Sequence, residues 1–182
     1  MKIQIVNLSE ENLKNIPVWE SYPYSCKYCI YWEYPEKFIS LKKKSKDEIF
    51  QEKLGWLRRV RKDFGDCEKL IYIDRKPVGY AQFAPPKFLP NLMNYDAGHP
   101  DKDSVIISCL FICNKNCRSL GLGKRLLESI IDDLKSRGIK IVETFARKDK
   151  ASNPSGPVEF YIKNRFRVYK DDPQFPLMRL DL

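Results

Sequence analysis

The sequence lacks the features that mark membrane and secreted proteins. No apolar run approaches the roughly 20 residues that a membrane-spanning helix needs. The first residues have neither a long apolar core nor a small-residue cleavage site, so we expect no secretory signal, a cytoplasmic location and no membrane partner. Internal repeats and low-complexity linkers are also missing. The 182 residues therefore predict one domain, residues 1–182, with a full hydrophobic core.

Histidine is nearly absent, since His99 is the only one. A cysteine nucleophile works with a base, and His99 lies in a distant predicted loop, so a catalytic cysteine is not expected. Cys26 and Cys29 form a CxxC with the spacing of metal ligands, but no second CxxC exists. Reduced thiols are the leading interpretation for all six cysteines. A zinc site, a redox pair and a reversible disulfide remain open.

No dense basic segment dominates the charge, although 33 basic and 24 acidic residues give a formal net charge of +9. This excess favours anionic partners such as a phosphorylated small molecule, or it serves solubility. The densest run, KKKSK at residues 42–46, falls in a predicted loop, and no recognised RNA motif is present. A basic RNA-associated protein, whose aromatic segment stacks bases, is therefore a weaker alternative, and no nucleic-acid partner is expected.

Apolar periodicity predicts an α/β fold with a mixed sheet of about six to seven strands, flanked by helices. Ser45 and Glu48 have the spacing of a capping box at the start of the most regular helix. Two long loops are predicted, an aromatic and CxxC-containing one at 25–45 and a proline-rich one at 85–103. The predicted strands span 2–7, 70–73, 78–84, 104–113, 139–146, 166–170 and 176–182, and the helices start near Glu10 and span 45–65, 121–137 and 157–164.

One turn carries a phosphate-binding pattern. Arg118, Gly121 and Gly123 lie between the apolar run 104–113 and an amphipathic helix. Glycine allows close approach of the backbone, and the unpaired N–H groups and dipole of a helix start favour an anion. The turn is not a P-loop, because Arg125 stands where serine or threonine is needed. Nor is it a dinucleotide fingerprint, because Leu126 replaces the required small residue.

The remaining pattern, R-x-x-G-x-G at 118–123, resembles the acyl-CoA pyrophosphate loop of the GNAT superfamily of N-acetyltransferases. The predicted element order is similar to that of GNAT domains over nearly the whole chain. The hairpin DRKPVGYAQF at 74–83 resembles their second and third strands. VEFYIKNRF at 158–166 resembles their later motif FYxKxGF, although Arg165 stands where that motif has glycine.

The resemblance implies transfer of an acetyl group from acetyl-CoA to an amine acceptor, by direct attack within a ternary complex. It places the pantetheine arm against the backbone of Phe111, Ile112 and Cys113. It assigns the pyrophosphate to N–H groups of the turn, Arg118, Ser119, Leu120, Gly121, Leu122, Gly123 and Lys124. Asn153 is matched to the family's asparagine with a register off by one. The protein would act as a monomer or homodimer.

The resemblance also assigns catalytic groups. Tyr161 matches the tyrosine of FYxKxGF, which in many relatives protonates the CoA sulfur, whereas packing against the core is the alternative. The general base is not assigned by the resemblance: Glu33 is the first candidate, His99, Glu143 and Asp96 are the others, and a water chain to any of them could serve. The aromatic segment 21–38 lies where relatives place the acceptor, as a cation-binding pocket or as a packed lid. An inactive CoA-binding or thiol- or metal-sensing module remains the alternative function.

Overall fold

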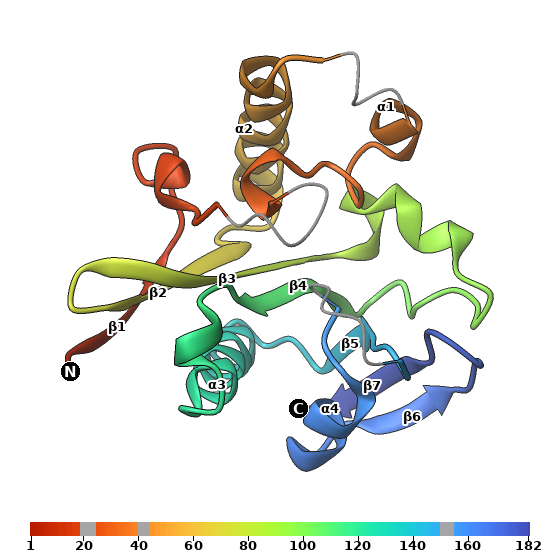
Figure 1. Ribbon diagram of the computed structural model, residues 1–182. Coiled ribbons are helices and arrows are strands. Elements are labelled where there is room, and N and C mark those ends of the chain that lie inside the picture. The colour runs from red at the N-terminus through yellow and green to blue at the C-terminus, as the bar shows by residue number, and fades with distance from the viewer. Residues whose placement is uncertain (19–24, 40–43, 150–154) are drawn as a thin grey trace.

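The computed structural model describes residues 1–18, 25–39, 44–149 and 155–182. They form one seven-stranded sheet in the order β1-β2-β3-β4-β5-β7-β6, with two helices on each face (Figure 1). The strands are β1 Ile3–Asn7, β2 Glu68–Ile73, β3 Lys76–Ala84, β4 Val105–Ile112, β5 Ile141–Phe145, β6 Arg167–Lys170 and β7 Leu177–Asp181. The helices are α1 Pro35–Ile39, α2 Lys46–Asp63, α3 Leu122–Ser136 and α4 Val158–Lys163. The mixed α/β sheet predicted from the sequence is confirmed.

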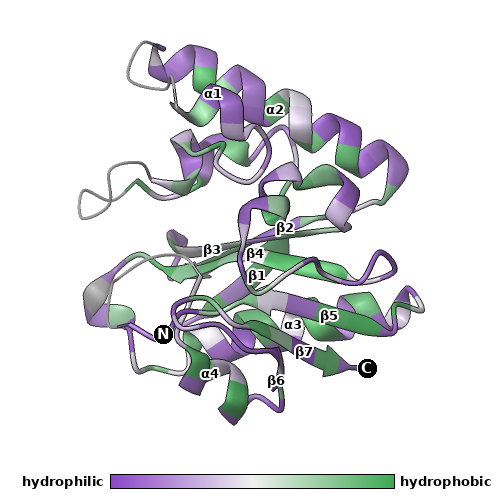
Figure 2. Cartoon of the chain, turned by 90° about the vertical axis from the view of Figure 1, so that its right-hand side faces the viewer, coloured by the Kyte–Doolittle hydropathy of each residue, from purple (hydrophilic) through white to green (hydrophobic). Residues whose placement is uncertain are grey.

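The sheet is covered on both faces, which explains why β4 is apolar throughout. All eight residues of β4 are buried, with alternate side chains facing opposite sides of the sheet. Helices α1 and α2 cover one face, and α3 and α4 cover the other (Figure 2). Apolar side chains therefore gather in two layers, one under α2 and one above α3 and α4. Among the described residues, no helix is both long and apolar enough to cross a membrane.

Helix α2 begins where the sequence predicts. The Ser45 hydroxyl accepts a hydrogen bond from the Glu48 backbone N–H (3.2 Å), and the Glu48 carboxylate accepts one from the Ser45 N–H (2.7 Å). This reciprocal pair satisfies two donors that the helix itself leaves unpaired. Asp63 is the last helical residue, and Gly65 follows with a φ of +96°.

One predicted helix is wrong. The segment expected to be helical from about Glu10 contains a single 3₁₀ turn, η1, Leu13–Asn15. The Asn12 side chain accepts a hydrogen bond from the Ser9 N–H (2.7 Å), so it closes a local turn in place of a helix. Pro17, two residues beyond η1, leaves no room for a longer helix.

The two predicted long loops contain short helical turns. The first holds η2, Cys26–Tyr28, and α1, and its residues 40–43 lie outside the described residues. The second contains η4, Pro86–Phe88, and η5, Pro90–Asn94, each opened by a proline. Both loops pack on the α2 side of the sheet, where Trp32, Leu89 and Leu92 are buried in the same apolar layer.

Candidate active site

Strands β4 and β5 separate along their length. They are the only parallel neighbours in the described sheet, and they pair only through Val105 with Val142 and Ile106 with Glu143. Beyond this point β4 continues to Ile112, still paired with β3 but no longer with β5. Backbone groups on that edge of β4 therefore face a gap in the sheet. An extended ligand can hydrogen-bond to these backbone groups, as an added strand does at the edge of a sheet.

The turn after β4 leads into α3, whose first backbone N–H groups have no partner within the helix. Ser119 and Gly121 both have positive φ values, +68° and +74°, and Gly121 is the N-cap of α3. A Cβ atom on Gly121 would meet nothing within 4 Å, so glycine is needed here for its conformation and not for space. Alternating left-handed residues next to a helix start form a concave group of donors that suits an anion.

Arg118 braces this turn against β4. Its Nε donates a hydrogen bond to the Ile112 carbonyl (3.0 Å), and its guanidinium lies 4.9 Å from the centre of the Phe111 ring. The Ile112 carbonyl, which the resemblance offers to the pantetheine arm, thus already has a partner within the protein. Arg118 places a fixed positive charge beside the gap.

A cavity of about 700 Å³ lies over the gap and the turn. It is bounded by β4, the start of α3 and one face of α4, and its described lining has four cationic side chains and no carboxylate. These are Arg118, Lys124, Arg147 and Lys163. An apolar wall with several converging cations suits a ligand that carries both a chain and phosphate groups.

Most of the residues that the sequence predicts for CoA line this cavity. They are Phe111, Ile112, Arg118, Ser119, Gly121, Leu122, Gly123 and Lys124. Cys113 and Leu120 do not line it. The Leu120 side chain is exposed to solvent over 50% of its surface. Asn153 lies outside the described residues.

The sequence pattern missed the opposite wall. Arg147, Phe160, Lys163 and Asn164 line the cavity from the segment after β5 and from α4. Arg147 is 8% exposed and donates from Nη1 to the Asp149 carbonyl (2.6 Å), while its buried Nε has no hydrogen-bond partner among the described residues. In the sequence these residues offered only the basic character of Arg147 and Lys163. No local pattern connects them with the turn at 118–123, so their place in the cavity could not be predicted.

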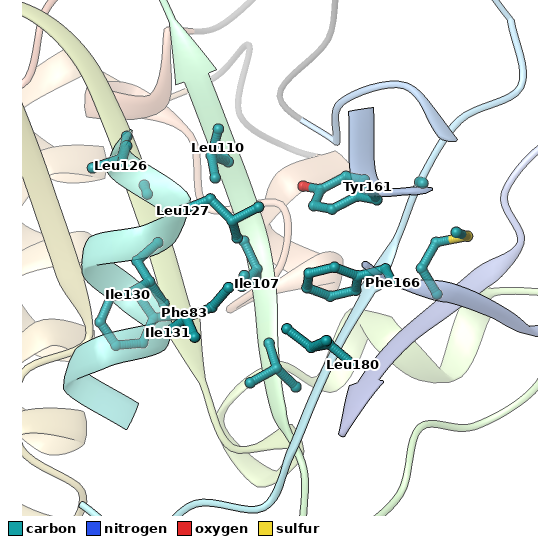
Figure 3. Close-up of a cluster of buried hydrophobic side chains, with 14 of the residues drawn as sticks. Phe83, Ile107, Leu110, Leu126, Leu127, Ile130, Ile131, Tyr161, Phe166 and Leu180 are labelled. Atoms are coloured by element: carbon teal, nitrogen blue, oxygen red, sulfur yellow. The ribbon is translucent and has the colours of Figure 1, made fainter. Parts of the chain in front are cut away.

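Tyr161 lies in the wall behind the cavity. Its side chain is 1% exposed, and Figure 3 shows its hydroxyl directed toward Leu110, a cavity residue of β4. The Thr144 side chain lies near the Tyr161 hydroxyl and lowers its pKa slightly, and the Thr144 hydroxyl donates to the Ile107 carbonyl across the gap (2.8 Å). Burial raises the pKa of Tyr161, so the phenol is protonated at neutral pH. Tyr161 thus places a buried, protonated hydroxyl next to the point where β4 and β5 separate.

Two of the four candidate bases are engaged in buried ion pairs. Glu33 accepts from Lys53 Nζ (3.1 Å) and from Gln82 Nε2 (3.0 Å). Glu143 accepts two hydrogen bonds from Arg179, at 2.9 and 2.8 Å. Each of these carboxylates connects distant elements of the fold through a buried ion pair. Neither residue lines the described cavity.

The other two candidate bases are exposed. His99 lies on the surface and contributes its backbone carbonyl to Lys170 Nζ (2.6 Å). Asp96 lines a separate cavity on the α2 side of the sheet. None of the four candidates lines the first cavity.

The cysteines form no metal site within the described part of the chain. All six are free thiols, and the buried Cys26 from the CxxC segment is hydrogen-bonded to Cys109 of β4. Burial raises the pKa of Cys26 and raises that of Cys29 to about 12. The thiols of Cys26 and Cys29 are thus held protonated, which makes them poor nucleophiles. The CxxC segment packs as part of the core on the α2 side.

Comparisons with known proteins agree with this geometry. Residues 27–161 match the acetyltransferase (GNAT) family. A PaiA N-acetyltransferase from Thermoplasma acidophilum, solved in complex with coenzyme A, is similar to this chain at 18% identity and a TM-score of 0.59, with 100% of both chains covered. A GNAT-family acetyltransferase from Staphylococcus aureus has 16% identity and a TM-score of 0.61, covering 100% of this chain and 99% of that one.

A third solved structure, the ribosomal-protein-S18-alanine N-acetyltransferase from Escherichia coli, has 14% identity and a TM-score of 0.55, covering 99% of this chain and 94% of that one. No curated protein sequence matches significantly. The family match spans well over half of the chain, and the chain belongs to the GNAT family of acetyltransferases. It is accordingly an acyltransferase with acetyl-CoA as co-substrate.

Proposed function

We propose that the cavity at the β4–β5 gap binds acetyl-CoA and that the protein transfers the acetyl group directly to an amine. The observation that carries this proposal is the convergence of the gap, the turn at 118–123 and four cations on one cavity whose described lining has no carboxylate. The pyrophosphate would lie on N–H groups of the turn, and the pantetheine arm along β4 at Phe111 and Ile112. Arg147 and Lys163 would bind phosphate from the opposite wall.

The chemistry follows from this placement. The amine nitrogen attacks the thioester carbonyl carbon, the C–N bond forms, and the C–S bond breaks. Tyr161 donates the proton that the leaving sulfur needs, and a proton lost by the amine restores it through solvent. Holding both reactants at the gap supplies most of the acceleration through orientation, so no covalent enzyme intermediate is required. Glu33 has a positioning role, because its carboxylate joins the aromatic segment to Lys53 of α2 and Gln82 of β3.

Two further statements belong to the proposal. We place residues 1–182 in one domain, supported by a sheet whose first strand starts at Ile3 and whose β7 ends at Asp181. We also propose a cytoplasmic location, supported by six free thiols, which persist in reducing compartments.

The test is calorimetric titration with acetyl-CoA of the parent, Gly121→Trp and Gly138→Trp. The two glycines are matched, with φ values of +74° and +75° and no atom within 4 Å of a Cβ added at either position, but only Gly121 lines the cavity. Strain is therefore similar in both variants. We expect the parent and Gly138→Trp to bind equally and Gly121→Trp to lose at least about tenfold in affinity, roughly 1.4 kcal/mol.

Equal binding by all three folded proteins would place CoA elsewhere. A second measurement follows release of free CoA thiol with a panel of amines. Binding of acetyl-CoA with no turnover on any amine would contradict the transferase chemistry and leave a CoA-binding module.

A further inference from the structure

The helix that carries Tyr161 is tied at its start to the segment after β5. The Arg147 N–H donates to the Gly156 carbonyl (3.0 Å), and the Arg147 carbonyl accepts from the Val158 N–H (3.1 Å). These two bonds form a short parallel bridge between Arg147 and Pro157. Val158 is the first residue of α4, and Tyr161 follows three residues later, on the same buried side of the helix. Arg147 therefore fixes the place from which Tyr161 projects.

This bridge lies on the gap side of β5. Ala146 and Lys148, on either side of Arg147, donate their backbone N–H groups to the segment that leads into β7. Successive residues of an extended chain direct their backbone groups to opposite sides, so Arg147 faces away from β7 and toward the side of β4. The segment bonded to Arg147 thus forms a wall of the gap, and its Gly156 and Pro157 line the first cavity.

Gly156 lies directly against the ring of Tyr161. A Cβ atom on Gly156 would come within 3.2 Å of Tyr161 Cε2 and 3.5 Å of the hydroxyl oxygen, and the first of these distances is too short for an ordinary carbon–carbon contact. Phe160 and Phe166 enclose the same ring edge-on, with centroids 5.1 and 5.2 Å away. A side chain at position 156 would therefore displace the phenol within a closely packed site.

The Tyr161 hydroxyl points to the place where we propose that the thioester lies. Figure 3 shows it directed toward Leu110, which lines the first cavity together with Gly156. A general acid must lie within hydrogen-bonding reach of the atom that it protonates, and a misplacement of about 1 Å can cost roughly a hundredfold in rate. Small movements of this phenol therefore affect kcat more than they affect binding of the cofactor.

The Arg147 side chain has an unused hydrogen-bond donor beside the same cavity. The residue is 8% exposed and lines the cavity, and its Nη1 is held by the carbonyl (2.6 Å) and Oδ1 (3.1 Å) of Asp149. The buried Nε has no hydrogen-bond partner anywhere in the described ranges. A buried N–H group without a partner is costly, and an oxygen atom of a bound cofactor removes that cost. The residue that anchors α4 thus also faces the cofactor.

We propose that Arg147 and Gly156 are positioning residues that connect cofactor binding to the placement of Tyr161. An oxygen of bound acetyl-CoA accepts a hydrogen bond from Arg147 Nε, and the backbone of Arg147 holds Gly156 and the start of α4. The bare Cα of Gly156 then leaves the space in which the phenol points at the leaving sulfur. This inference rests on the proposed acetyl transfer, because it concerns how the general acid of that reaction is placed.

The experiment is a pair of double-mutant cycles on kcat at saturating acetyl-CoA. The amine is the one that the parent acetylates fastest among n-butylamine, spermidine, L-lysine and a peptide with a free N-terminus. We expect Gly156→Ala to lower kcat about tenfold and Arg147→Lys about fivefold, with KM for the amine unchanged. In Tyr161→Phe, which has no hydroxyl to misplace, each substitution should lower kcat by less than about twofold.

Gly138→Ala is the matched control for Gly156→Ala. The two glycines have φ values of +75° and +74°, so alanine strains the backbone to the same extent at both positions. A Cβ atom on Gly138 meets nothing within 4 Å, and Gly138 does not line the first cavity. We expect the two variants to lose similar thermal stability, and only Gly156→Ala to lose kcat.

Several outcomes overturn the inference. If either substitution leaves kcat unchanged, or if its effect is as large in Tyr161→Phe as in the parent, that residue does not act through the Tyr161 hydroxyl. A loss of stability in Gly156→Ala far beyond that of Gly138→Ala, together with weaker acetyl-CoA binding, would make Gly156 a structural residue only. A parent that binds acetyl-CoA but acetylates no amine would instead reject the proposed function itself, so the two failures are distinguishable.

Discussion

Single residues decide whether acetyl transfer follows binding, and Tyr161 is the first to test. Its ring packs against Phe160 and Phe166 with centroids 5.1 and 5.2 Å away, so Tyr161→Phe keeps the packing and removes only the hydroxyl. We expect kcat to fall about a hundredfold, the usual contribution of a positioned general acid. Affinity for acetyl-CoA, measured by calorimetry, should stay the same.

Two results would contradict a proton-donating role for Tyr161. A kcat within about twofold of the parent would leave the residue as a core tyrosine, because a general acid contributes far more. A parallel loss of thermal stability and of acetyl-CoA affinity would point to damaged packing instead. The pH dependence of kcat in Tyr161→Phe is an independent measurement, because loss of a general acid changes it and loss of packing does not.

At the scale of elements, the start of α2 has a measurable contribution. Ser45→Ala removes one half of the reciprocal pair with Glu48 and leaves a helix N–H group unpaired. We expect the free energy of unfolding, measured with urea, to fall by about 1 kcal/mol. Ser136→Ala at the exposed end of α3 is the control, since its hydroxyl only returns to the Asp133 carbonyl of the same helix.

An unfolding free energy that falls equally in both serine variants would mean that the capping box makes no special contribution. Element order and helix capping are local properties, which is why α2, α3 and the strands of the sheet were predictable from the sequence. The segment after Ser9 was not, because a side-chain turn at Asn12 competes with a helix at similar energy.

For the whole molecule, a buried polar network connects the α2 side of the sheet. Lys53 of α2 contacts Glu33 (3.1 Å), Glu68 of β2 (3.7 Å) and Gln82 of β3 (3.0 Å). The Tyr80 hydroxyl lies within hydrogen-bonding distance of both Glu68 and Gln82. Glu68 is fully buried, and burial raises its pKa to about 7, against the opposing effects of Lys53 and Tyr80.

This network makes global stability depend on pH. The folded protein keeps a proton on Glu68 that the unfolded chain releases, so this stabilisation is complete below about pH 4.5 and is lost as pH rises toward about 7. Over that window the parent should lose up to about 3 kcal/mol relative to Glu68→Gln, in denaturation at several pH values. Tyr80→Phe, which removes a bond favouring the ionised carboxylate, should move the loss to higher pH.

A constant difference between the parent and Glu68→Gln across this window would show that Glu68 titrates alike in the folded and unfolded chain. No local pattern indicated this network, because Glu33, Lys53 and Glu68 look like ordinary charged residues until the fold buries them together.

The sequence by itself determined the order of the strands and of α2, α3 and α4, the capped start of α2, and the glycine turn at 118–123, because each depends on residues within a few positions of one another. The tertiary structure alone decided the rest. Arg147 and Lys163 line the first cavity, and Glu33 forms a buried ion pair with Lys53. Tyr31, Asp96 and Asp172 line a separate cavity on the α2 side of the sheet. These contacts join segments that are distant along the chain. They come together only because the loops at 25–45 and 85–103 and the β6–β7 turn pack against the same sheet. A pattern of neighbouring residues cannot predict such contacts between distant segments.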